Sequence, residues 1–308
     1  SRRGCERGSK KGRLPQGLII VLDEWHPTPE VLQILSLARD FAEREQPVTV
    51  RQTFYHLVSV GAIPNTEPAY RRLVRVLIRA RKSGIIPFDW FVDPSRHPLK
   101  LKLYRNVGEF LTEELEHYYR DTWNTQDTYV IVWIEKQAVQ RPLWPVVGKY
   151  NVSLYPGRGY SSWPLFLQAV EELEEHSEKN LVMLYLGDYD PSGVDISRDL
   201  KRRFEEWGVE LAAFTRLALT RNQIEEYELP PMPAKRGDPR YANFVMSHGD
   251  FAVELDALPP RVLRELVDNA ILRCLDVQVF REEVAKEQSE KAWLREKVQE
   301  LKDAFDAS

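Results

Sequence analysis

Cysteine is scarce in this sequence, which has only Cys5 and Cys274 among its 308 residues. Two cysteines cannot build a disulfide framework or a thiolate cage for a metal ion, and the six histidines never fall at the close spacing of zinc ligands. Long apolar runs are missing too, because none reaches the roughly 18 residues that a membrane span needs. The N-terminus is too polar for a signal peptide. We therefore expect a cytoplasmic protein with no structural zinc and no membrane segment.

The net charge of −4 conceals an asymmetry along the chain. Residues 1–120 hold 20 Lys and Arg against 14 Asp and Glu, whereas the remainder holds 23 against 33. This pattern indicates that the first part contacts a polyanion and that the second part gathers cations. Ordinary surface variation gives the same pattern, so charge alone does not choose between the two interpretations.

The N-terminal part carries the start and stop signals of three helices joined by short turns. Thr49 and Gln52 form the capping-box pattern, and Gly61 ends the helix that follows. The segment around Pro87, after the third helix, is typical of an edge strand or wing. These signals predict helices over residues 28–45, 49–61 and 67–83, a strand over 85–93, a flexible basic tail over 1–17, and hence a winged-helix domain over 18–97.

From residue 128 the pattern changes to apolar strands that alternate with helices. Such alternation predicts a parallel sheet covered by helices on both faces, which is the α/β fold class. The strands are expected at residues 128–135, 151–155, 181–188 and 211–215. The complete division adds a connecting helix at 103–120 within the segment 98–127, an α/β domain over 128–275, and a C-terminal helix over 276–308 that packs on the body or on a second copy of the chain.

Acidic residues follow two of the predicted buried strands. Glu135 ends the first strand, and Asp188 and Asp190 end the third. Because the carboxyl ends of parallel strands line one crevice, we expect these acids to meet there. Carboxylates packed closely repel one another unless a cation neutralises them, and Mg²⁺ prefers oxygen ligands. Turn-forming aspartates are common after strands, but an acid on a second strand favours a metal site.

The motifs around these acids resemble a known family. The stretches IEKQAV, GRGYSS and LGDYDPSG resemble the Toprim domain of the topoisomerase VI A subunit and of the related meiotic DNA-break protein. In that family, a glutamate after the first strand and a D-x-D-P-x-G motif after a later strand bind Mg²⁺. The resemblance implies that Glu135, Asp188 and Asp190 are the metal ligands here. Ser192 stands where the family usually has an aromatic residue.

The glycine-rich stretch GRGYSS is a weak phosphate loop, because no Gly-Lys-Ser/Thr follows it. We therefore expect no nucleotide-binding site in this chain. The resemblance implies that Gly157, Gly159 and Tyr160 are structural or face DNA.

The helix predicted from Thr49 carries a tyrosine near an arginine. An apolar stripe on this helix leaves Arg51 and Tyr55 together on an adjoining face, four residues apart. A tyrosine nucleophile needs positive charge or a base nearby, and Arg51 supplies the charge or binds a phosphate. From the residues alone, a half-buried structural tyrosine is the more ordinary interpretation. His56 either assists proton transfer or is an exposed neutral histidine.

The segment VRQTFYHL also resembles the winged-helix segment of the same family, in which an arginine lies four residues before the catalytic tyrosine. The resemblance therefore implies that Tyr55 is the nucleophile and that Arg51 assists it. The two resemblances together cover residues from about 28 to 270.

The third predicted helix is strongly basic. Its cations lie opposite Leu73, Leu77 and Ala80, as expected for a helix that packs its apolar side and exposes its charges. A solvated face is the ordinary interpretation, but a recognition helix contacts phosphates and grooves in this way. The expected DNA-binding residues are Arg71, Arg72, Arg75, Arg79 and Lys82.

The resemblance implies Mg²⁺-dependent cleavage of double-stranded DNA through a 5′-phosphotyrosyl link, by a nucleoid-associated homodimer that joins the tyrosine of one subunit to the metal site of the other. The family works with a separate ATPase subunit, and the short chain favours a stand-alone member. Two alternatives stay open. In one, water attacks at the metal site and Tyr55 is structural; in the other, the protein binds DNA without cutting it.

Overall fold

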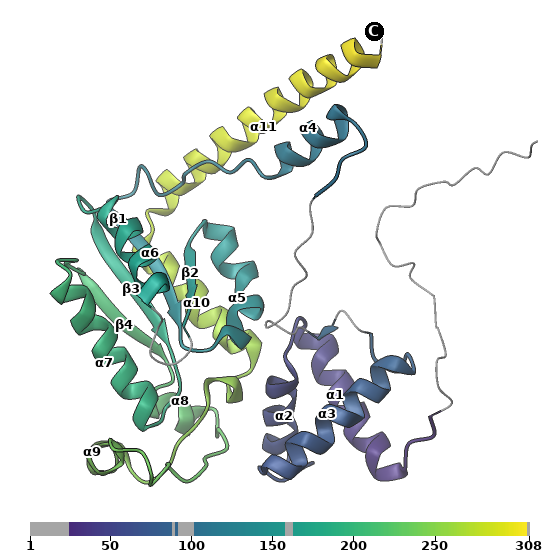
Figure 1. The fold of residues 1–308 in the computed structure, drawn as a ribbon, viewed down its shortest axis with the longest axis vertical. Coiled ribbons are helices and arrows are strands. Elements are labelled where there is room, and N and C mark those ends of the chain that lie inside the picture. Colours follow the sequence, from purple (N-terminus) through teal and green to yellow (C-terminus); the bar gives the residue numbers. More distant parts are fainter. Residues whose placement is uncertain (1–24, 88–89, 92–101, 158–162, 307–308) are drawn as a thin grey trace, which may run out of the picture.

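The computed structural model describes residues 25–87, 90–91, 102–157 and 163–306. Figure 1 shows a helical bundle, an α/β part beside it, and a helical arm that extends away from the α/β part. The predicted N-terminal tail, residues 1–17, lies outside the described residues.

The three N-terminal helices form as predicted. They are α1 (Pro29–Glu45), α2 (Val50–Ser59) and α3 (Glu67–Lys82). At the start of α2, the Thr49 side chain accepts a hydrogen bond from the Gln52 amide, and the Gln52 side chain accepts one from the Thr49 amide. This capping box satisfies two of the backbone donors that a helix start leaves open. Gly61 follows α2 with a φ of +72°, a conformation that favours glycine.

The wing predicted over residues 85–93 is not a strand in the part of this segment that the structure describes. The amides of Ile85 and Ile86 both donate to the Ala80 carbonyl, which folds the chain back on the end of α3. A single parallel bridge then joins Val48 to Phe91. Because the amides of Ile85 and Ile86 donate to α3, they are not available to pair with a neighbouring strand. The expected strand was therefore wrong for these two residues.

The α/β part contains the predicted parallel sheet. Its strands are β1 (Thr128–Ile134), β2 (Ser153–Pro156), β3 (Asn180–Leu186) and β4 (Ala213–Ala218), in the order β2-β1-β3-β4. All three pairings are parallel, and β1 and β3 pair over their whole lengths. The α/β fold class with a parallel sheet is thus confirmed.

Helices cover both faces of this sheet. On one face lie α5 (Gln140–Val147) and α10 (Pro260–Cys274), and on the other lies α7 (Pro191–Glu206) (Figure 1). The helix α6 (Trp163–Glu174) packs on α7. Trp133 on β1 is fully buried against Phe204 of α7. The shorter elements are η2 (Gln137–Val139), η3 (Gly148–Tyr150), α8 (Arg221–Glu226), α9 (Tyr241–His248) and η4 (Leu255–Ala257).

The third part pairs α4 (Val107–Glu116) with the 30-residue α11 (Val277–Asp306). The connecting helix was predicted over 103–120, so α4 is shorter than expected. The chain leaves the helix before Arg120, whose guanidinium binds Glu283 and Glu290 of α11. No helix in the described part of the chain is long and apolar enough to cross a membrane.

Candidate functional site

The acids predicted at the strand ends meet at one edge of the sheet. Glu135 directly follows β1, and Asp188 comes two residues after β3. Because β1 and β3 are parallel and in register, their carboxyl ends lie side by side. The Glu135 carboxylate accepts a hydrogen bond from the Asp188 amide at 3.0 Å. The Asp188 carboxylate accepts one from the Leu255 amide at 2.7 Å.

Asp190, the third predicted ligand, begins the helix that follows β3. Its side chain accepts a hydrogen bond from the Gly193 amide at 2.6 Å and so caps α7. Its charge acts on Glu135, whose pKa it helps to raise. The three predicted acids therefore gather at one place.

Two glycines give the acids this close packing. A Cβ atom at Gly193 would overlap the Asp188 carbonyl and lie 2.9 Å from the Glu135 carboxylate. A Cβ atom at Gly187 would lie 2.6 Å from the same carboxylate. Only glycine leaves room for the Glu135 side chain to reach the backbone here, which explains the last position of the D-x-D-P-x-G motif.

A lysine and two further acids complete this cluster, and the sequence analysis missed all three. The Lys136 ammonium lies 3.0 Å from Asp188, 2.9 Å from Glu254 and 3.4 Å from Asp256. Asp256 is only 2% exposed. The two acids could have been found from the stretch FAVELDAL, in which Glu254 and Asp256 interrupt an apolar run.

Burial and mutual repulsion shift the pKa values of these acids. Burial, together with the charge of Asp188, raises the pKa of Glu135. Burial also raises the pKa of Asp188, although Lys136 opposes the shift. Burial alone would raise the pKa of Glu254, but Lys136 and Arg51 lower it to about 2. The carboxylates at this edge thus outnumber the cations that touch them.

Mg²⁺ suits the donor chemistry of the cluster. Buried carboxylates in excess of nearby cations stabilise a hard divalent ion, and oxygen atoms are its preferred ligands. Within the described ranges, however, no three His, Cys, Asp or Glu side chains are arranged so that they could hold a metal ion. Lys136 already neutralises Asp188 in this arrangement. Loading of Glu135, Asp188 and Asp190 with Mg²⁺ therefore requires these side chains to reorient.

The helix α2 brings Arg51 and Tyr55 to the same region. Arg51 donates two hydrogen bonds to the Glu254 carboxylate, at 2.9 and 2.7 Å. Its guanidinium also lies over the rings of Tyr70, at 4.9 Å, and Tyr55, at 5.9 Å. Through Glu254 and Lys136, the predicted tyrosine site and the predicted acid site are connected within one chain.

Tyr55 is more buried than the helix pattern indicated. It is only 2% exposed, because α2 packs on α1 and α3 and also on η4 of the α/β part. Burial raises the pKa of Tyr55, the charge of Glu254 raises it further, and Arg51 and Lys136 only partly oppose the shift. The phenol therefore stays protonated in this arrangement.

His56 does not share this environment. Its ring stacks on Phe41 of α1 with a centroid distance of 4.3 Å, and burial lowers its pKa. The expected exposed histidine is therefore partly buried, and it packs on α1.

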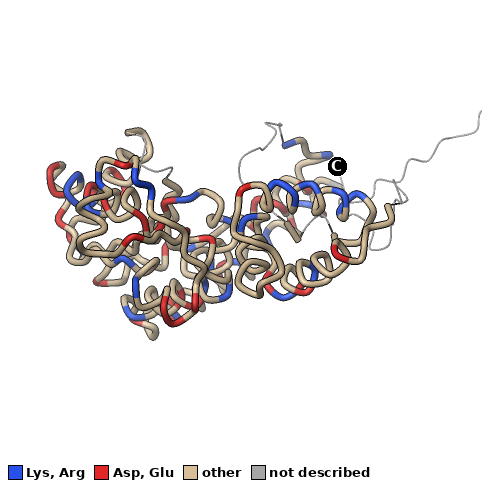
Figure 2. The backbone as a smooth tube through the Cα atoms, turned by 90° about the horizontal axis from the view of Figure 1, so that it is seen from below, with Lys and Arg blue, Asp and Glu red and all other residues tan. Residues whose placement is uncertain are grey.

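The basic residues of α3 form an exposed face. Leu73, Leu77 and Ala80 are buried, as predicted, and all the predicted DNA-binding cations are exposed, namely Arg71, Arg72, Arg75, Arg79 and Lys82. Figure 2 shows that acidic and basic positions are interspersed in the α/β part. The α3 face, by contrast, is basic over its length, apart from Glu67, which pairs with Arg71 at 3.0 Å.

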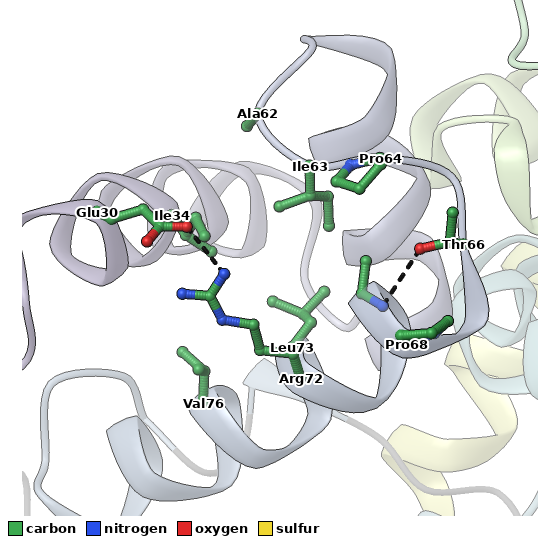
Figure 3. A pocket seen from close by; sticks show the side chains of 11 residues that line it. Glu30, Ile34, Ala62, Ile63, Pro64, Thr66, Pro68, Arg72, Leu73 and Val76 are labelled. Carbon is green, nitrogen blue, oxygen red and sulfur yellow. Dashed lines mark hydrogen bonds and ion pairs between the residues drawn. The ribbon is translucent and has the colours of Figure 1, made fainter.

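A pocket of about 310 Å³ lies beside this face, between α1 and α3 (Figure 3). Apolar side chains line it, among them Ile34, Ile63 and Val76. Across it, Arg72 pairs with Glu30 of α1 at 2.8 Å. The acids at the sheet edge do not line it, so it is separate from the candidate site.

Three smaller predictions concern the loops around the site. The Gly157 amide donates to the Ile134 carbonyl at 2.7 Å and so has a structural contact. Gly159 and Tyr160 lie outside the described residues. The Ser192 hydroxyl donates to Asp238 at 2.9 Å and does not contact the predicted ligands through that bond.

Comparison with known proteins found no match, either among protein-family models or among curated proteins. The resemblance to the topoisomerase VI A subunit therefore rests on the motifs that contain Arg51, Tyr55, Glu135, Asp188 and Asp190.

Proposed function

We propose that this protein is a Mg²⁺-dependent, DNA-cleaving enzyme similar to the topoisomerase VI A subunit, built from a winged-helix-like domain and a Toprim domain. The observation that carries the proposal is the chain of contacts from Tyr55 and Arg51, through Glu254 and Lys136, to Asp188. A candidate nucleophile, an arginine with the geometry to bind a phosphate and a group of buried acids thus occur together. The exposed cations of α3 supply a surface for duplex DNA.

Each residue of the candidate site has a separate role in the proposed reaction. The Tyr55 hydroxyl attacks a backbone phosphorus, a phosphorus–oxygen bond to tyrosine forms, and the bond to the 3′ oxygen breaks. The phenolic proton is transferred to the departing 3′ oxygen, which leaves as a hydroxyl. Arg51 binds the phosphate oxygens and stabilises the charge that develops on them. When bound on Glu135, Asp188 and Asp190, Mg²⁺ would stabilise the leaving 3′ oxygen. The product is a 5′-phosphotyrosyl link, which retains a phosphodiester and can be religated.

One observation favours a second candidate function. Because Tyr55 is buried, a Toprim nuclease in which water attacks and Tyr55 stays structural needs no movement of α2. This candidate uses the same acids and the same DNA-binding face.

The test uses uniformly labelled supercoiled DNA in Mg²⁺, followed by denaturation, nuclease digestion and measurement of label left on the protein. We expect label on the wild type and on Tyr119→Phe, a control at an exposed tyrosine, but none on Tyr55→Phe. Cutting by Tyr55→Phe at the wild-type rate would establish the water-dependent nuclease instead. Glu135→Ala should not cut DNA under either candidate function, and cutting by this variant would refute the acid site.

A homodimer is also part of the proposal, and inactive variants can test it. If a tyrosine acts on the acids of the partner subunit, a mixture of Tyr55→Phe and Glu135→Ala subunits regains nicking activity. If Tyr55 acts with the acids of its own chain, the mixture of the two variants stays inactive. Relaxation of supercoiled DNA with and without ATP, after addition of an ATPase subunit of this enzyme class, tests for strand passage.

A further inference from the structure

The contact between Arg51 and Glu254 joins two parts of the molecule that are far apart in sequence. Arg51 lies on α2, and Glu254 immediately precedes η4 in the α/β part. Two side-chain nitrogens of the arginine bind the two oxygens of the carboxylate, at 2.9 and 2.7 Å. A phosphate presents oxygens to arginine in the same two-point geometry. Glu254 therefore occupies Arg51 in the way a DNA phosphate would.

A second polar contact supports the same docked position. Glu45, at the end of α1, accepts a hydrogen bond from the Arg261 amide at 2.9 Å, and its carboxylate lies 3.5 Å from the Arg264 guanidinium. Both arginines belong to α10. The helical part is thus held against the α/β part at two points, one at the end of α1 and one on α2.

In this docked position the candidate nucleophile, Tyr55, is covered. Tyr55 is 2% exposed beneath the contact, and the carboxylate of Glu254 acts on its phenol. A duplex cannot bring a phosphorus atom to the Tyr55 oxygen until α2 moves away from η4. Arg51 is well placed to meet DNA first, because its side chain is one-third exposed and it lies over Tyr70, on the helix that carries the basic face.

We propose that Glu254 is a latch, which holds Arg51 and keeps α2 closed over Tyr55 until a DNA phosphate takes the place of the carboxylate. The inference rests on the proposed function, in which Tyr55 must reach DNA. Once Arg51 binds the phosphate, Glu254 keeps Lys136 as its partner, so the displaced carboxylate is not left unpaired. Glu254 is a positioning residue in this scheme, since it acts through Arg51 and Lys136.

The experiment compares Glu254→Gln and Arg51→Gln, which break the same pair from opposite sides. Amide hydrogen exchange of residues 50–59 reports the opening of α2, and we expect both variants to speed it about tenfold. Binding of a short duplex, measured in EDTA at about 0.1 M salt, reports access to Arg51. We expect Glu254→Gln to bind severalfold more tightly than the wild type and Arg51→Gln to bind more weakly.

The matched control is Glu225→Gln, which removes one negative charge from an exposed pair with Arg221 on α8. It should change neither measurement, and the tighter binding of Glu254→Gln should disappear in the double variant with Arg51→Gln. Unchanged exchange in Glu254→Gln, or duplex binding no tighter than that of the control, would overturn the latch. Neither readout involves cleavage, so these results are distinct from a failure of the proposed reaction.

Discussion

The helical part and the α/β part handle charge in opposite ways. The helix α3 exposes its cations and buries its apolar side, whereas the α/β part buries its key acids, with Glu135 at 8% and Asp188 at 7% exposure. Exposed cations attract a polyanion over a distance and lose little on binding it. Buried acids repel one another and require a cation among them. The first region thus presents positive charge to solvent, which suits the proposed contact with DNA, and the second encloses positive charge among its acids.

The two arrangements meet at Arg51 and Lys136. Arg51 is a cation of the helical part that pairs with an acid of the α/β part, and Lys136 is the cation that the acids themselves surround. If Glu254 acts as the proposed latch, access to Tyr55 is controlled where these two regions meet.

Removal of the buried cation should have the largest effect on stability. Lys136→Met leaves Asp188, Glu254 and Asp256 without their shared partner, so we expect the free energy of unfolding to fall by about 3 kcal/mol. Urea unfolding measures this change. Mg²⁺ should restore more stability to this variant than it adds to the wild type, because it supplies the missing charge.

The control for this prediction is Lys149→Met, which removes an exposed ammonium from its pair with Asp268. A surface pair contributes about 0–1 kcal/mol, so the control should stay close to the wild type. Equal stability of Lys136→Met and Lys149→Met would show that the acids of the α/β part do not depend on a buried cation.

A methyl group at Gly193 should have the next largest effect. In Gly193→Ala, the new Cβ atom overlaps the Asp188 backbone and crowds the Glu135 carboxylate, so we expect a loss of about 2 kcal/mol and of DNA cutting. Thermal unfolding and the cleavage assay measure the two losses. Gly237→Ala is the matched control, because no atom lies within 4 Å of its added Cβ. Full activity of Gly193→Ala would contradict the role of Glu135.

Removal of a single cation from the exposed basic face of α3 should have the smallest effect on stability. Arg75→Gln and Lys82→Gln should each change the free energy of unfolding by less than about 0.5 kcal/mol, because both side chains are exposed. Each should weaken duplex binding and reduce its salt dependence by about one phosphate contact. Titration of a duplex at several salt concentrations measures this. Arg221→Gln on α8 is the control, and equal losses from it would remove the distinction between the two regions.

Local patterns in the sequence were enough to predict the helices, the strands and one part of the candidate site. The capping box of Thr49 and Gln52, the left-handed Gly61 and the apolar runs are local signals, because neighbouring residues decide them. The meeting of Glu135 and Asp188 was also predictable, since parallel strands bring their carboxyl ends to one edge. The motifs that resemble a Toprim domain pointed to the same residues.

The other features of the site depend on contacts between segments that are remote in the chain. Helical periodicity could place Arg51 and Tyr55 on one face of α2, but it could not show that η4 covers that face, because η4 lies about 200 positions away in the chain. A separation of 118 positions in the chain likewise concealed Glu254 as a partner of Lys136, and Asp256 lies two residues further on. The return of Ile85 and Ile86 to α3 replaced the expected strand. Contacts between remote segments depend on how whole elements dock, and docking is set by packing and charge pairing across the interface, which no local pattern contains.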